Sequence, residues 1–113
     1  MQMTIVEAAD DVLNVALTGR LDTPGVDHVE TPLSNAVAQR GANAVIDLSK
    51  VEFVGSMAIR MFMSVARAQA RKGLKLVLYA PQPLVGQLFD TVSLRDIIPV
   101  EADVQAALRA ARG

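Results

Sequence analysis

The residues best suited to chemistry lie together in residues 47–60, whose sequence is DLSKVEFVGSMAIR. A pattern typical of a buried strand changes there to a helical one, and the helix is predicted to begin at Ser56. A phosphoryl group on its hydroxyl would add about −1.5 to −2 charge and three acceptor oxygens. Free N–H groups at a helix start favour such an anion, and Arg60 follows one turn later. Ser56 is therefore a candidate phosphorylation site; the alternative is that its hydroxyl only caps the helix.

The other polar side chains do not form a catalytic or metal-binding pattern. His28 is the only histidine, and no second ligand or serine–aspartate pair accompanies it at a useful spacing, so we expect an exposed position on a helix. Asp22 follows a turn and is expected to cap the next segment. Asp47 ends a strand, where a lone carboxylate more often forms a turn than binds a ligand. We predict no catalytic residue, no metal and no cofactor.

The composition limits the classes of function. The 113 residues are 51% hydrophobic and 20% charged, which is typical of a single domain over residues 1–113 with a modest core. The 11 Lys and Arg do not outnumber the 12 Asp and Glu, so the chain lacks the positive surplus that favours nucleic-acid binding. No apolar run is long enough for membrane insertion and no basic leader is present, so we expect a cytoplasmic protein. The absence of cysteine excludes disulfides, thiol catalysis and cysteine-ligated zinc.

The elements that must position Ser56 follow from hydrophobic periodicity and turn residues. Strands are predicted over residues 3–7, 12–18, 43–48, 74–79 and, briefly, 97–100. Helices are predicted over residues 26–40, 56–72, 84–89 and 104–111, the last with Asp103 as its cap. Two connections are predicted as well, a turn at Asp10 and Asp11 and a loop over residues 19–25. The first helix has two alternative starts, because Thr31 and Pro32 form a good cap and first-turn pair.

The second helix carries a polar stripe. Its polar residues recur at steps of three or four and are Ser56, Arg60, Ser64, Arg67 and Arg71. Three methionines, at positions 57, 61 and 63, either fill the core or form an adaptable surface, and we expect at least one to be exposed. After the opening hairpin, strands alternate with helices. This order, β-β-α-β-α-β-α-β-α, predicts an α/β fold with a mixed sheet of four to five strands flanked by about four helices.

Four segments resemble the STAS domains, a family named for sulfate transporters and anti-sigma factor antagonists. They are GRLD at 19–22, DLS at 47–49, FVGS at 53–56, and the tail from Pro83 to Pro99 with Leu94. Each motif is weak by itself, but their order and spacing cover nearly the whole chain and are fairly specific. The resemblance implies a STAS-like fold and a regulatory binding module rather than an enzyme.

Stand-alone bacterial members imply a definite partner and switch. The resemblance implies binding to a serine-kinase-type, ATP-using anti-sigma factor, which frees a sigma factor, and loss of binding when Ser56 is phosphorylated. It places the following residues on the partner surface: Asp22, Gly55, Ser56, Met57, Arg60 and Ser64. We expect the protein to be a monomer or weak dimer, with no nucleic-acid partner.

Two residues depart from the family pattern on either side of Ser56. Phosphorylatable members usually have Asp before the serine and Ser or Thr after it, whereas this chain has Gly55 and Met57. The alternative function is therefore a STAS subunit that is not phosphorylated, for example a structural subunit of a lipid ABC transporter or of another multiprotein complex.

Overall fold

A central five-stranded sheet organises the computed structural model, which describes residues 1–9 and 11–113 except for the side chains of 7–9. Its strands, in spatial as well as chain order, are β1 (Gln2–Ala9), β2 (Val12–Leu21), β3 (Asn43–Val54), β4 (Leu76–Tyr79) and β5 (Val100–Glu101). β1 is antiparallel to β2, and β2 to β5 are parallel to one another. The prediction of a mixed sheet is confirmed.

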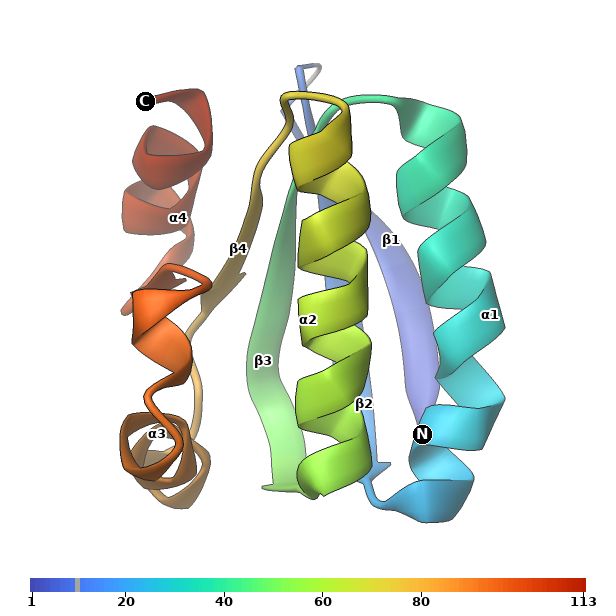
Figure 1. The fold of residues 1–113 in the computed structure, drawn as a ribbon, viewed down its shortest axis with the longest axis vertical. Coiled ribbons are helices and arrows are strands. Elements are labelled where there is room, and N and C mark those ends of the chain that lie inside the picture. Colours follow the sequence, from blue (N-terminus) through green and yellow to red (C-terminus); the bar gives the residue numbers. More distant parts are fainter. Residues whose placement is uncertain (10) are drawn as a thin grey trace.

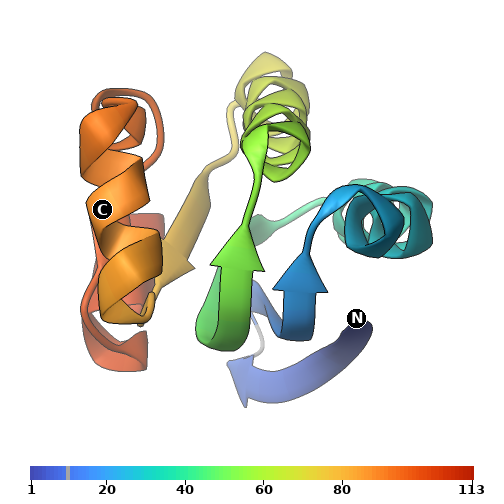
Figure 2. The same cartoon turned by 90° about the horizontal axis from the view of Figure 1, so that it is seen from below.

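Helices cover both faces of this sheet (Figures 1 and 2). They are α1 (Thr23–Arg40), α2 (Ser56–Arg71), α3 (Pro83–Thr91) and α4 (Val104–Arg112), with a 3₁₀ turn, η1 (Leu94–Asp96), between α3 and β5. α1 and α2 lie side by side on one face, whereas α4 packs against β3 and β4 from the other face. The predicted order of strands and helices is confirmed.

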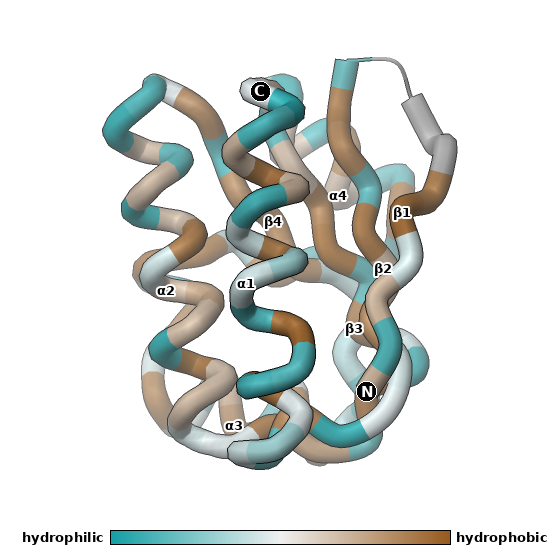
Figure 3. The backbone as a smooth tube through the Cα atoms, turned by 90° about the vertical axis from the view of Figure 1, so that its right-hand side faces the viewer, coloured by the Kyte–Doolittle hydropathy of each residue, from teal (hydrophilic) through white to brown (hydrophobic). Residues whose placement is uncertain are grey.

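Two apolar layers follow from the alternation of side chains along the strands. Ile46 and Leu78 point toward α1, α2 and α3, where they join Phe62 in the larger core. Their neighbours Val45 and Val77 point toward α4 and form a smaller core there. β3 and β4 are covered on both faces, so they show continuous apolar runs. Figure 3 shows the hydrophobic colours concentrated along the strands, whereas α1 is mostly hydrophilic with isolated hydrophobic positions.

The start of α1 differs from both alternatives considered for it. The Asp22 carboxylate accepts a hydrogen bond from the N–H of Gly25 at 2.9 Å, so Asp22 caps the helix as predicted and α1 begins at Thr23. Pro32 therefore lies inside the helix rather than at its start. The predicted loop over residues 19–25 is wrong as well, because β2 continues to Leu21. A side chain on Gly25 would collide with the carbonyl oxygen of Arg20, which explains the glycine.

Three further boundaries differ from the prediction. β3 extends beyond residue 48 to Val54, because its parallel pairing with β2 continues through two register shifts. β4 begins at residue 76 rather than 74. The strand predicted at 97–100 is displaced to residues 100–101, because the N–H groups of Ile97 and Ile98 both bond to Leu94 in the 3₁₀ turn. Asp10 of the predicted first turn lies outside the described residues.

The turns at the amino end of β3 depend on one buried side chain, Gln69 of α2. It is 1% exposed, and its amide donates to the carbonyl oxygens of Ala42 at 2.8 Å and Lys75 at 3.1 Å. These carbonyls belong to the segments that lead into β3 and β4. Gln69 therefore fixes α2 to both connections at once.

We expect Gln69→Leu to lower the free energy of unfolding by about 1–3 kcal/mol, because it keeps a similar volume but removes both buried hydrogen bonds. The Lys75 carbonyl keeps only its bond from the Ala44 N–H. Urea denaturation followed by circular dichroism measures the change. Gln39→Leu, on the exposed side of α1, is the matched control and should stay within about 0.5 kcal/mol of the wild type. Equal stability of the two variants would contradict this role.

The only tyrosine of the chain, Tyr79, is held on the α4 side of the sheet. Its hydroxyl donates to the side-chain oxygen of buried Asn14 at 3.1 Å. Burial raises the pKa of Tyr79 above its ordinary value, and the carboxylate of Asp47 adds to the rise. The folded protein thus binds the phenolic proton more tightly than the unfolded chain does.

We expect the ultraviolet absorbance of native Tyr79 to titrate with a midpoint above pH 10, and to return to about 10 in denaturant. No other tyrosine or tryptophan obscures this signal. The stability supplied by the protonated hydroxyl is complete below the unfolded pKa and is lost as the pH rises toward the folded pKa. Tyr79→Phe should therefore lose less stability than the wild type between about pH 9 and 11. A native midpoint at or below 10 would refute the expectation.

Candidate functional site

The candidate site forms where the carboxyl ends of β2 and β3 meet. These strands are parallel neighbours, and the N–H of Gly55 donates to the carbonyl oxygen of Leu21 at 3.0 Å. One residue after each strand, the chain enters a helix: α1 follows Asp22, and α2 begins at Ser56 after Gly55. Two helix N-termini therefore open at the same end of the sheet, at the bottom of Figure 1. Their free N–H groups make this end favourable for negative charge.

The backbone alone makes the first turn of α2. Gly55 is the N-cap, with extended φ and ψ of −100° and −179°, and no side chain caps the helix. Its carbonyl accepts from the N–H groups of Ala58 at 3.1 Å and Ile59 at 3.3 Å. α2 begins at Ser56 as predicted, but the alternative that the Ser56 hydroxyl caps the helix is wrong. Ser56 is exposed, and within the described part of the chain its hydroxyl has no hydrogen-bond partner.

Four of the predicted partner residues, Ser56, Met57, Arg60 and Ser64, lie along α2 from this end, whereas Asp22 caps α1. Met57 is 40% exposed, and Arg60 and Ser64 are exposed on the following turns. Met61 is buried, so the methionines divide between surface and core as expected. Ser64 lies farthest from the start of α2, where it lines the groove between α1 and α2. The polar stripe of α2 is therefore at the surface along its whole length, and its role in binding stays a prediction.

Sequence reasoning missed three residues beside this strip. The Arg20 guanidinium lies over the Phe53 ring, 4.6 Å from its centroid, and 3.6 Å from the Asp22 carboxylate. Phe53 is 40% exposed and Leu84 of α3 is 75% exposed. Both line a shallow groove of about 290 Å³ between the end of β3 and α3. Phe53 belongs to the FVGS motif, but only the extension of β3 to Val54 shows that its ring faces outward.

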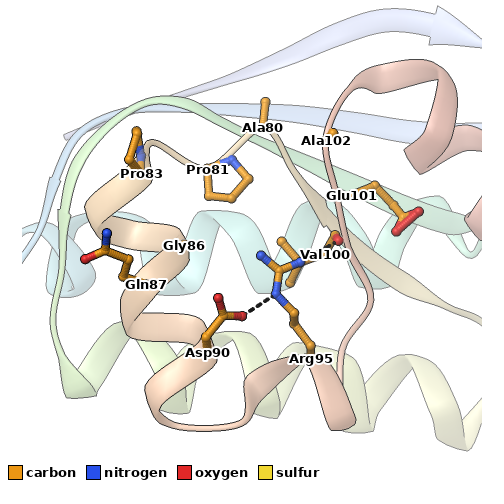
Figure 4. A pocket seen from close by; sticks show the side chains of 10 residues that line it. All are labelled: Ala80, Pro81, Pro83, Gly86, Gln87, Asp90, Arg95, Val100, Glu101 and Ala102. Carbon is orange, nitrogen blue, oxygen red and sulfur yellow. Dashed lines mark hydrogen bonds and ion pairs between the residues drawn. The ribbon is translucent and has the colours of Figure 1, made fainter.

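A separate pocket of about 530 Å³ lies at the carboxyl ends of β4 and β5, beside α3 (Figure 4). The Arg95 guanidinium donates to the Asp90 carboxylate at 2.6 Å and to the carbonyl oxygen of Val100 at 2.9 Å. In Figure 4, Arg95 and Asp90 point toward each other, whereas Glu101 points away from both. The arginine charge is therefore already matched, and these contacts tie η1 to α3 and β5. The polar residues of this pocket therefore hold η1, α3 and β5 together, and we assign them a structural role.

The remaining residues considered in the sequence are Asp47 and His28. The expectation that Asp47 ends a strand and forms a turn is wrong, because β3 continues to Val54. Its carboxylate accepts from the N–H of Ser49 at 2.9 Å within β3, where the pairing with β2 shifts register. His28 is exposed on α1, as predicted. In the described residues, acidic and histidine side chains do not gather into a group that could hold a metal ion. Among the same residues, no helix is both long and apolar enough to cross a membrane.

We expect Gly55→Asp to raise the free energy of unfolding by about 0.5–1 kcal/mol, because a carboxylate at this extended N-cap can accept the free N–H groups of α2. An added Cβ would lie 3.4 Å from the edge of the half-exposed Phe53 ring, which can adjust. Gly41→Asp is the contrasting control. The φ of Gly41 is +62°, which strains any side chain, so this variant should lower the free energy of unfolding by about 1 kcal/mol. Thermal unfolding of both variants checks the opposite signs.

The amino-acid sequence of this chain is similar to a known domain family and to a named bacterial protein. A family model of the STAS domain matches residues 3–107. BtrV of Bordetella bronchiseptica, a candidate anti-sigma factor antagonist, is 26% identical over 110 residues, which are 97% of this chain and 94% of BtrV.

Solved structures share the fold. The crystal structure of an anti-sigma factor antagonist from Mycobacterium paratuberculosis superposes with a TM-score of 0.86 at 24% identity, covering 99% of this chain and 96% of that one. SpoIIAA of Bacillus in its phosphorylated form gives a TM-score of 0.70 at 16% identity, covering 96% and 98%. With the family match over residues 3–107 and the same fold in these structures, the chain belongs to the STAS domain family.

Proposed function

We propose that this protein is a cytoplasmic anti-sigma factor antagonist that acts by binding and not by catalysis. Its partner in this proposal is a serine-kinase-type, ATP-using anti-sigma factor, and capture of that partner frees a sigma factor. The proposal is supported by the names of BtrV, of which the match covers 94%, and of a structural neighbour, both described as anti-sigma factor antagonists. The observation that supports it most directly is the exposed Ser56 hydroxyl, unbonded within the described residues, at the start of α2.

The proposed contact surface combines apolar anchors with nearby positive charge. Met57, Phe53 and Leu84 are the exposed large apolar side chains at or beside the start of α2. Arg60 adds positive charge to this end of the domain, whereas the charge of Arg20 is paired with the Asp22 carboxylate at 3.6 Å. Partially exposed apolar side chains within a polar rim are typical of the residues that dominate binding energy. Burial of Met57 against the partner would also bury Ser56, its neighbour in the chain.

Phosphorylation of Ser56 would then prevent binding without unfolding the domain. The phosphate would lie at the N-terminus of α2, where the helix dipole and free N–H groups stabilise an anion. Because position 55 is glycine, no carboxylate immediately before Ser56 repels the phosphate. The partner, in contrast, would have to desolvate a group with about −1.5 to −2 charge. The modification therefore changes the free energy of association far more than that of folding.

A second function is favoured by the residues that flank Ser56. Gly55 leaves α2 without a side-chain cap, and Met57 presents a thioether where phosphorylatable relatives have a second hydroxyl. A STAS subunit that is never phosphorylated, within a lipid ABC transporter or another multiprotein complex, would need neither group. Its stable companion would be a membrane-associated ATPase assembly rather than a kinase-like regulator.

We expect Ser56→Asp to weaken binding to the cognate kinase-like anti-sigma factor by at least about 30-fold, which corresponds to about 2 kcal/mol. Ser56→Ala should bind like the wild type. Isothermal titration calorimetry, with candidate kinase-like regulators from the same genome and ATP, measures the affinities. The matched control is Thr31→Asp, exposed on α1 and outside the groove that Ser64 lines, which should change affinity by less than about threefold.

Incubation of the wild type with the same regulator and ATP, followed by mass spectrometry, separates the two functions. One phosphoryl group on Ser56, absent from Ser56→Ala, supports the switch. Equal affinity of Ser56→Asp and the wild type would refute the phosphorylation switch, although binding to the kinase-like regulator would still support the proposed partner. Failure to bind any kinase-like regulator, together with co-purification of a transporter ATPase, would favour the second function.

A further inference from the structure

We propose that β1 is a self-association edge, through which two copies of this protein pair their first strands antiparallel and join their sheets. Each copy would contribute residues 2–6 about a two-fold axis near Thr4 or Ile5. This contact is separate from the start of α2, so it adds to the proposed function without depending on it.

The two edges of the sheet are protected to very different degrees. The β5 edge is a strand of two residues preceded by Pro99, and α4 packs beside it. β1 is a strand of eight residues, and in Figures 2 and 3 no helix or strand of the described residues lies on its outer side. Natural proteins usually protect such edges with short strands, proline or lysine. The first nine residues contain no proline and no lysine or arginine.

Apolar side chains flank the open edge on both faces of the sheet. Ile5, opposite Val15 of β2, is on the α1 side and is 50% exposed. Val6, opposite Asn14, is on the other side and is 39% exposed. Their register with β2 is regular from Gln2 to Val6, and the irregularity lies beyond Val6. The segment therefore presents a regularly paired stretch of strand with its apolar groups next to unpaired backbone.

The side chains of this segment match a second copy of themselves. An axis through Thr4 would place Met3 opposite Ile5 and Gln2 opposite Val6, in pairs that hold no like charges. The side chains of residues 2–6 are all uncharged, so this segment has no charge with which to select a charged partner. Two identical strands satisfy the same backbone groups reciprocally, and a two-fold contact closes after one pairing. A second copy is thus the occupant that fits best.

The size of the contact sets the expected strength. Five paired residues on each copy bury less area than a stable interface of standard size. We therefore expect a reversible dimer with a dissociation constant above about 1 µM and below about 1 mM. Sedimentation velocity of the full chain over that concentration range should show a monomer that converts to a dimer and stops there.

We expect Ile5→Lys to weaken the dimer at least tenfold, because it places two like charges at the paired edge. Ile97→Lys is the matched control: Ile97 is equally exposed, at 55%, but lies after η1, so its dimer should match that of the wild type. Circular dichroism confirms that both variants fold. A protein that is monomeric up to about 1 mM, or a dimer that Ile5→Lys leaves intact, would overturn the proposal.

Cysteine cross-linking gives a second, geometric readout. The chain has no cysteine, so a single one introduced at Thr4 or Ile5 can form a disulfide only with a second copy. Cα atoms must lie within about 7 Å for this bond, a distance that only residues near the axis satisfy. Thr4→Cys or Ile5→Cys should cross-link at least tenfold faster than Thr31→Cys on exposed α1. Equal rates at all three positions, or growth into larger species, would refute this pairing.

Discussion

The parallel pairing of β2 with β3 is the constraint on which the rest of this structure depends. Both strands end at the same side of the sheet, and the hydrogen bond from the Gly55 N–H to the Leu21 carbonyl holds these ends together. The chain leaves each end directly into a helix, so α1 and α2 begin beside each other and pack on the same face. The position of Ser56 in space therefore follows from backbone pairing rather than from contacts of its own side chain. A residue positioned in this way can change its chemistry without altering the fold.

The same arrangement separates stability from recognition. The side chains that hold the domain together are buried or turned inward: Gln69 ties α2 to two connections, and Tyr79 bonds Asn14 beneath the sheet. The side chains at the start of α2 do little for folding, because Gly55 caps the helix through its backbone and Met57 is 40% exposed. Side chains that contribute little to folding can contact a partner, or be modified, without destabilising the domain. This separation is what the reversible contact proposed for the start of α2 would require.

Sequence patterns predicted the elements well where one physical signal dominated. β3 and β4 were recognisable because they are buried on both faces, and α2 because its polar stripe recurs with helical spacing. Asp22 and Asp103 were expected caps, and each accepts the N–H group that a cap should accept. The failures occurred where tertiary contacts outweighed local preference. Pro32 has a strong tendency to begin a helix, yet the cap at Asp22 and the packing of α1 begin the helix at Thr23.

The sequence by itself determined the fold class, the order of elements and the place of Ser56 at a helix start, because periodicity and capping are local properties of the chain. Only the tertiary structure decided which side chains surround that serine. The extension of β3 to Val54 depends on its pairing with β2, and it turns Phe53 outward, under Arg20 and beside Leu84. The exposure of the β1 edge was likewise decided by the sheet order. These features join residues far apart in the chain, and no local pattern encodes which distant strand or helix will lie alongside.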